Sequence, residues 1–114
     1  MDLNADDLPW EYPRLLADER GVWQEDGPGR RFGIEWNEIV RVTGYKLDGI
    51  TETYACIELD FEFGGFIEMN SSFPGFQSAI ASITERLPLL DPGWFQNVMR
   101  LTVKDPAIEC WIRV

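Results

Sequence analysis

Histidine is absent from this 114-residue sequence, and cysteine occurs only twice. Histidine is the commonest general base and the usual zinc ligand, so its absence excludes every Ser-His or Cys-His dyad. Asp and Glu remain, but they are so abundant that a carboxylate pair arises by chance and makes no case for hydrolysis. We therefore predict that the protein is not an enzyme and that it binds no metal and no cofactor.

Basic residues are also scarce in this chain. It has 10 Lys and Arg against 20 Asp and Glu, which gives a formal net charge of −10. Such a field disfavours nucleic acid and anionic membranes as partners, and it favours a basic protein or a cation. A role in solubility alone is the other interpretation of this charge.

Long apolar runs are missing as well. The first residues, MDLNADDLPWEYP, have neither the basic start nor the apolar core of a secretory signal, and no later segment could span a bilayer. We expect a cytoplasmic protein that is a monomer before it binds a partner. Cys56 and Cys110 do not form a CxxC motif, so we expect two reduced thiols that fill space.

What is present predicts one domain, residues 1–114. Hydrophobic residues make up 45% of the chain, and a chain of this length can bury one core but not two. Residues 1–9 are acidic and poorly patterned, which is typical of a flexible lead-in.

The clearest pattern lies between Thr53 and Asn70. Apolar and polar residues alternate before Gly64-Gly65 and again after it, so the two runs predict a hairpin with one buried face. The buried face of the hairpin would carry Ala55, Ile57, Leu59, Phe61, Phe63, Ile67 and Met69. The other face would carry Tyr54, Cys56, Glu58, Asp60, Glu62 and Glu68.

The same pattern predicts the turn of this hairpin. A three-residue loop, residues 63–65, keeps the apolar side chains together, whereas a two-residue loop would mix the faces. This loop pairs Phe61 with Ile67 and brings Asp60 opposite Glu68. Like charges directly opposite each other cost a few tenths to about 1 kcal/mol, so an acidic face of this kind requires a reason.

Weaker patterns predict the remaining elements. They are a helix of one or two turns in residues 13–20, a hairpin of residues 21–26 and 31–36, a strand in 38–47, a helix ending near Leu87, a two-turn helix after Pro92 and a last strand in 108–114. The predicted fold class is α+β: a curled antiparallel sheet of about five to six strands, covered by one main helix in the C-terminal half and a short second helix. The predicted core contains Ile34, Trp36, Val40, Val42, Ile57, Leu59, Phe61, Ile67, Phe76, Ile80 and Ile83.

The outward side of the central hairpin is the candidate site. We predict that it binds a protein partner through Tyr54, Glu58, Asp60, Glu62 and Glu68. The three carboxylates on the first strand follow one another at about 7 Å. Carboxylates spread along a flat strand do not make the tight oxygen cage that a hard cation needs. A solvated acidic surface with no partner is the alternative interpretation.

A resemblance adds to this prediction. The run GRRFGIEWNEIVRVTGYKLD, followed by ELDFEFGGFIEMN, PGFQSAI, LP and WF, resembles small bacterial immunity-type proteins, such as those of contact-dependent growth inhibition. The resemblance implies a compact half-barrel of the pleckstrin-homology type closed by a helix. It also implies an inhibitor that neutralises a cognate basic toxin domain, and nuclease toxins must be basic to bind phosphates.

The alternative function is a pleckstrin-homology-like module that binds a ligand or protein other than a toxin. In that case Arg30 and Arg31, in the turn of the first hairpin, would contact a phosphorylated ligand. Two arginines would then act against the field of a strongly acidic chain.

Overall fold

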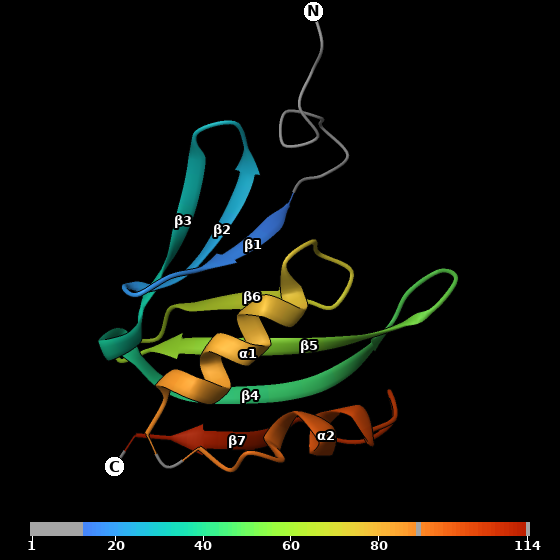
Figure 1. Cartoon of the computed structure of the whole chain (residues 1–114). Coiled ribbons are helices and arrows are strands. Elements are labelled where there is room, and N and C mark those ends of the chain that lie inside the picture. Colours follow the sequence, from blue (N-terminus) through green and yellow to red (C-terminus); the bar gives the residue numbers. More distant parts are fainter. Residues whose placement is uncertain (1–12, 89, 114) are drawn as a thin grey trace, which may run out of the picture.

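The structure is a computed structural model that describes residues 13–88 and 90–113. Within these residues the fold is α+β, with antiparallel sheets and two α-helices (Figure 1), as predicted. The elements are β1 (Arg14–Ala17), β2 (Gly21–Gly27), β3 (Arg30–Glu35), the 3-10 helix η3 (Trp36–Glu38), β4 (Ile39–Asp48), β5 (Thr53–Phe61), β6 (Phe66–Asn70), α1 (Phe76–Arg86), α2 (Trp94–Met99) and β7 (Ile108–Ile112). The predicted lead-in, residues 1–9, lies outside the described residues.

The prediction of one curled sheet with five to six strands is wrong. The described strands form two sheets, one with the order β1-β2-β3 and one with the order β6-β5-β4-β7. The division occurs at η3, where the chain leaves β3 and turns into β4. The side chain of Glu38 accepts a hydrogen bond from the backbone N–H of Glu35 at 2.8 Å, which stabilises this corner.

The predicted helix in residues 13–20 is also wrong, because residues 14–17 form β1. This strand pairs with β2, and the N–H of Leu15 donates to the carbonyl of Pro74 at 2.8 Å. A helix of one or two turns is marginal by itself. Strand pairing instead satisfies the backbone and buries Leu15 in the core.

Gly75 lies directly before α1, where the chain passes close to β1. Its φ is 86°, and a Cβ on this residue would lie 2.0 Å from the carbonyl oxygen of Leu15. Glycine avoids both the left-handed strain and this clash. The helix therefore begins at Phe76, with its apolar side turned toward the sheets.

Both helices cover one face of the larger sheet. α1 crosses this sheet, and α2 lies beside β7 (Figure 1). The buried residues of α1 are Phe76, Ala79, Ile80 and Ile83, as the helical spacing predicts. The close approach of α2 depends on Gly44 in β4, where a Cβ would lie 2.4 Å from Cγ2 of Val98.

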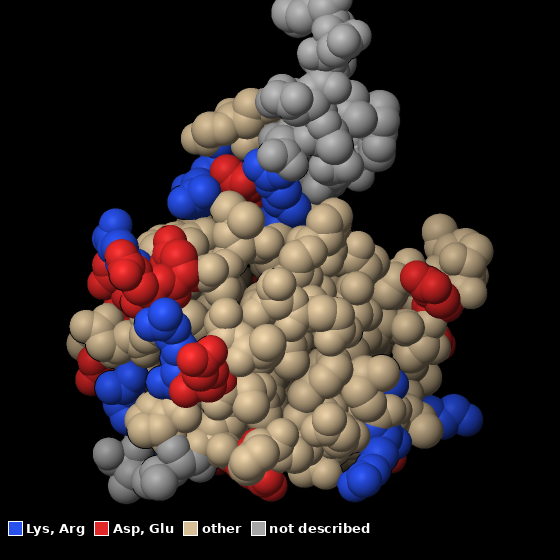
Figure 2. Space-filling model, viewed as in Figure 1, with Lys and Arg blue, Asp and Glu red and all other residues tan. Residues whose placement is uncertain are grey.

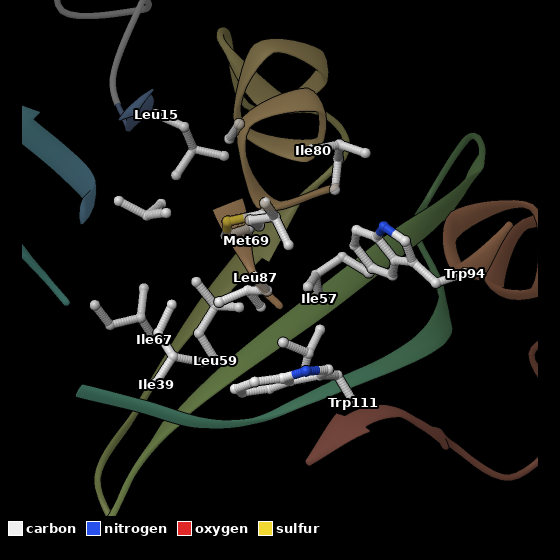
Figure 3. Close-up of a cluster of buried hydrophobic side chains, with 14 of the residues drawn as sticks. Leu15, Ile39, Ile57, Leu59, Ile67, Met69, Ile80, Leu87, Trp94 and Trp111 are labelled. Atoms are coloured by element: carbon white, nitrogen blue, oxygen red, sulfur yellow. The ribbon is translucent and has the colours of Figure 1, made fainter. Parts of the chain in front are cut away.

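The core lies between the helices and the two sheets, and Figure 3 shows part of it. Most of the predicted core is buried, including Ile57 and Leu59, but Trp36 and Phe61 are only partly buried. Val40 is half-buried and Ile39 is fully buried in its place. The reason is a β-bulge between Ile39 and Arg41, which reverses the predicted alternation at the start of β4.

The predicted hairpin of β5 and β6 is present, but its register is wrong by two residues. Leu59 pairs with Ile67, Glu58 pairs with Glu68, and Asp60 pairs with Phe66. The loop contains residues 62–65, one more than predicted, because both β-strands stop at the phenylalanines that flank it. The apolar and acidic faces survive this change, since a two-residue shift preserves the side to which every side chain points.

Candidate functional site

The site lies on the face of the larger sheet that points away from α1 and α2. We call it the open face and define it by Arg41, Thr43 and Tyr45 of β4, Cys56, Glu58 and Asp60 of β5, and Phe66, Glu68 and Asn70 of β6. These residues alternate with the core residues of the same strands. Strand pairing arranges them in rows across the sheet.

One row of the open face is acidic. Glu58 in β5 has Glu68 of β6 directly on one side and Thr43 of β4 on the other. Thr43 is followed by Glu109 of β7. The pKa of Glu58 is raised, mainly by burial and then by the neighbouring carboxylate of Asp60. The row therefore concentrates negative charge, and it contains no Lys or Arg among the described residues.

Tyr45 sets the position of Glu68. Its hydroxyl donates to Oε2 of Glu68 at 2.5 Å. The pKa of Tyr45 is raised, mainly by burial and then by this hydrogen bond. The tyrosine therefore stays protonated as the donor and holds the Glu68 carboxylate against the sheet.

The adjacent row is built on Asp60, which is 6% exposed. Nε and Nη2 of Arg41 each lie 2.7 Å from the same oxygen, Oδ2 of Asp60. This hydrogen bond raises the pKa of Arg41. The other oxygen, Oδ1, is buried and has no hydrogen-bond partner among the described residues.

The open face continues into a groove of about 1200 Å³. It is bounded by η3, the start of β4, the β5–β6 loop and the end of β7. Its acidic lining comprises Glu35, Glu38, Glu58, Asp60 and Glu62, and its apolar lining includes Val40, Phe61, Phe63, Phe66 and Ile112. Phe63 is 94% exposed and Phe66 57% exposed, and exposed apolar residues of this size beside a groove are typical of a binding surface.

Arg113, at the edge of the groove, has a structural role. Its guanidinium donates to the carbonyls of Ile39 at 3.1 Å and Trp36 at 3.2 Å. It thereby ties the end of β7 to η3 and fixes one wall of the groove. On that wall, the carboxylate of Glu35 accepts a hydrogen bond from the guanidinium of Arg20 at 2.9 Å, and the carboxylate of Glu38 accepts one from the backbone N–H of Glu35.

The structure brings together only some of the predicted partner-binding residues. Glu58, Asp60 and Glu68 lie side by side, and Glu62 lies in the loop at the groove. Tyr54 is on the same face but six residues from Asp60 along β5, about 20 Å away in an extended strand. It therefore belongs to the opposite end of the sheet.

The aromatic part of the site was not predicted from the sequence. The alternation of β5 placed Phe63 on the buried face at the start of the predicted loop, outside the predicted core, and Phe66 was given no role. The signal was the tip sequence FGGF, which places two large apolar residues at a hairpin turn where no core can reach them. Arg41 was also missed, because its pairing with Asp60 depends on register.

The two cysteines are protonated near neutral pH. Cys56 is fully buried, and burial raises its pKa and that of Cys110 to about 11. Both cysteines are free, as predicted. Within residues 13–88 and 90–113, no group of three or more acidic or cysteine side chains is arranged to hold a metal ion.

The arginines of the alternative prediction lie elsewhere. Arg30 and Arg31 are in the β2–β3 hairpin, which projects away from the larger sheet (Figure 1). Nη2 of Arg31 lies 3.6 Å from Glu25, a residue that also binds Arg14. The charge of Arg31 is therefore partly neutralised within the small sheet.

The helix side of the molecule carries less charge at its centre than the open face does. Figure 2 shows that the surface over α1 carries little charge and that most charged side chains in this view lie toward the edges. No helix in the described part of the chain is long and apolar enough to cross a membrane. Comparison with family models, with curated proteins and with solved structures found no match.

Proposed function

We propose that this protein is an immunity-type inhibitor that binds a basic toxin domain, of the nuclease class, through its open face. It acts in the cytoplasm by covering the toxin and carries out no reaction itself. The observation that carries the proposal is the direct pairing of Glu58 with Glu68 on the sheet face opposite α1 and α2.

This pairing is unfavourable in the isolated protein. Like charges directly opposite on neighbouring strands destabilise a sheet by about 0.2 to 1 kcal/mol. Tyr45 holds Glu68 in place, so the repulsion is not relieved by moving that carboxylate away. Lysines and arginines of a partner would turn the same arrangement into an attraction.

A nuclease domain fits this acidic surface because it must itself carry positive charge. It binds phosphates through clustered Lys and Arg, and an acidic protein surface offers those residues a substitute for the phosphates. A net charge of −10 also accelerates encounter with a basic partner. Exposed Phe63 and Phe66 add the apolar contact that stable interfaces contain.

The test uses the toxin domain encoded beside the gene for this chain. Co-expression should protect cells from that domain, and the two purified proteins should form a complex whose association rate falls as salt is raised. The double variant Glu58→Lys/Glu68→Lys should associate at least tenfold more slowly. Glu19→Lys/Glu85→Lys, which makes the same change in net charge at two exposed positions off the open face, is the control.

Two outcomes would overturn the proposal. One is that the parent protein neither protects cells nor forms the complex. The other is that both double variants slow association equally, because total charge and not the open face would then determine binding. A melting curve for each variant shows that the comparison is made between folded proteins.

A further inference from the structure

The strongest feature that the proposed function leaves unexplained is the buried oxygen Oδ1 of Asp60. The Asp60 side chain is 8% exposed, and Oδ1 has no hydrogen-bond partner among the described residues. Buried carboxylate oxygens are normally hydrogen-bonded. The described residues therefore leave this oxygen without a donor.

The neighbouring side chains do not supply that donor. Arg41 uses both of its nearby nitrogens on Oδ2. Glu58 and Glu68, from the adjacent row, offer only acceptors while they are ionised. Phe66, which pairs with Asp60 across β6, has no polar group. The missing donor must come from outside the described residues or from a proton on a carboxylate.

Glu58 indicates what kind of donor fits. When it is protonated, it donates to Asp60, and this hydrogen bond contributes to the raised pKa of Glu58. Both carboxylates line the same groove and belong to one face of β5. A cation with several N–H groups can replace that proton and bind both carboxylates together.

The aromatic residues favour one cation over the other. Phe66 lies next to Asp60 in the sheet, and Phe63 extends from the adjoining loop with 94% of its surface exposed. A guanidinium group stacks on aromatic rings and presents its N–H donors in a planar fork, whereas an ammonium group is a strongly hydrated point charge. The groove therefore suits arginine better than lysine.

We infer that the Glu58–Asp60 pair is the anchor point of the interface and receives one arginine side chain of the partner protein, with Phe63 and Phe66 against its guanidinium and stem. The inference rests on the proposed function for the identity of the partner. It adds that one buried arginine, and not diffuse charge attraction, fixes the partner in the groove. Because Oδ1 is buried, the side chains around it must move for this arginine to reach it.

The probe is N-acetyl-arginine-N-methylamide, titrated into the ¹⁵N-labelled full chain and followed by NMR. We expect saturable shifts in the backbone amides of Glu58, Asp60 and residues 62–66. The lysine analogue should bind several-fold more weakly. The citrulline analogue, which has the same shape without the charge, should cause no saturable shifts.

Two variants and two controls test the residues named. Glu58→Gln and Phe63→Ala should each weaken binding of the arginine probe at least threefold. Their controls are Glu52→Gln and Ile50→Ala, which change an exposed acid and an exposed apolar residue in the β4–β5 loop, at the other end of the sheet, and both should bind like the parent. Shifts spread over the whole acidic surface, or equal weakening by variants and controls, would overturn the inference.

The same variants separate this inference from the proposed function. If the toxin domain binds the parent, and Glu58→Gln and Phe63→Ala bind it as tightly as their controls do, the arginine anchor is wrong and the inhibitor proposal stands. If the arginine probe binds in the groove but the toxin domain does not bind the protein, the anchor stands and the inhibitor proposal is wrong.

Discussion

Arg41 and Asp60 pair directly across β4 and β5, and both Nε and Nη2 of Arg41 lie 2.7 Å from one oxygen of the buried aspartate. The arginine is half exposed while the aspartate is not. This pair therefore places a positive charge on the acidic part of the open face. It also fixes the carboxylate that we propose as part of the anchor.

Replacing Arg41 should show how much stability the fold loses when the buried Asp60 has no ion-pair partner. Arg41→Met should lower the urea midpoint of unfolding, because a buried carboxylate then loses its ion-pair partner. The double variant Arg41→Met/Asp60→Leu should recover most of that loss, since neither charge remains. Equal midpoints for Arg41→Met and the parent would show that the ion pair does not stabilise the fold.

Removing the charge of Glu58 should stabilise the protein at neutral pH. Burial and Asp60 raise the pKa of Glu58 in the folded protein, so the folded state holds this proton more tightly than the unfolded state does. The stability that the proton provides is complete below the unfolded pKa of about 4.3, and it is lost as the pH rises through the raised folded value. Glu58→Gln should therefore gain about 0.2 to 1 kcal/mol at pH 7 and low salt.

The pH dependence is the control for that prediction. Urea unfolding of Glu58→Gln and the parent should give converging stabilities near pH ~3, well below the unfolded pKa, where both side chains are neutral. A gain that persists unchanged at that pH would assign the effect to packing of the amide and not to charge.

Leu59 and Phe61 should differ in their response to alanine, although both were expected in the core. Leu59 is fully buried beneath α1 (Figure 3), whereas Phe61 is partly exposed at the groove. Leu59→Ala should cost about 2 to 5 kcal/mol as a cavity variant, and Phe61→Ala should cost less. Thermal melting that ranks the two variants the other way would contradict the assigned packing.

Gly44 and Val98 should be coupled in stability. Gly44→Ala places a methyl group 2.4 Å from Cγ2 of Val98, and a β-branched side chain has little freedom to move away, so overpacking should cost about 1 to 3 kcal/mol. In the background of Val98→Ala the same change should cost much less. A double-mutant cycle with no interaction energy would show that α2 does not depend on this contact.

The sequence predicted the faces of the central hairpin because alternation depends only on the period of a strand. Ile57, Leu59, Ile67 and Met69 are buried together, and Glu58, Asp60 and Glu68 lie together on the other side. The acidic side of the candidate site was therefore predictable from local pattern. The helix α1 was predictable for the same kind of reason, since its apolar residues follow a helical period.

Pattern could not set the register of this hairpin. A slip by one residue exchanges the faces, but a slip by two keeps every side chain on its side, so the pairing of Glu58 with Glu68 depended on the loop that β5 and β6 form. The groove also depended on the β5–β6 loop, because the four-residue loop leaves Phe63 at an exposed tip.

Tertiary contacts decided the remaining features. Residues 14–17 become a strand only because β2 offers a pairing edge and the carbonyl of Pro74 accepts from Leu15. β2 follows β1 after a short turn, but Pro74 lies far along the chain. The bulge before Arg41 arises from pairing with β5, and it places Arg41 against Asp60. The sequence alone determined which side chains are apolar or acidic on each strand. Only the folded chain decided which of them meet, because those meetings depend on distant pairings that no local period contains.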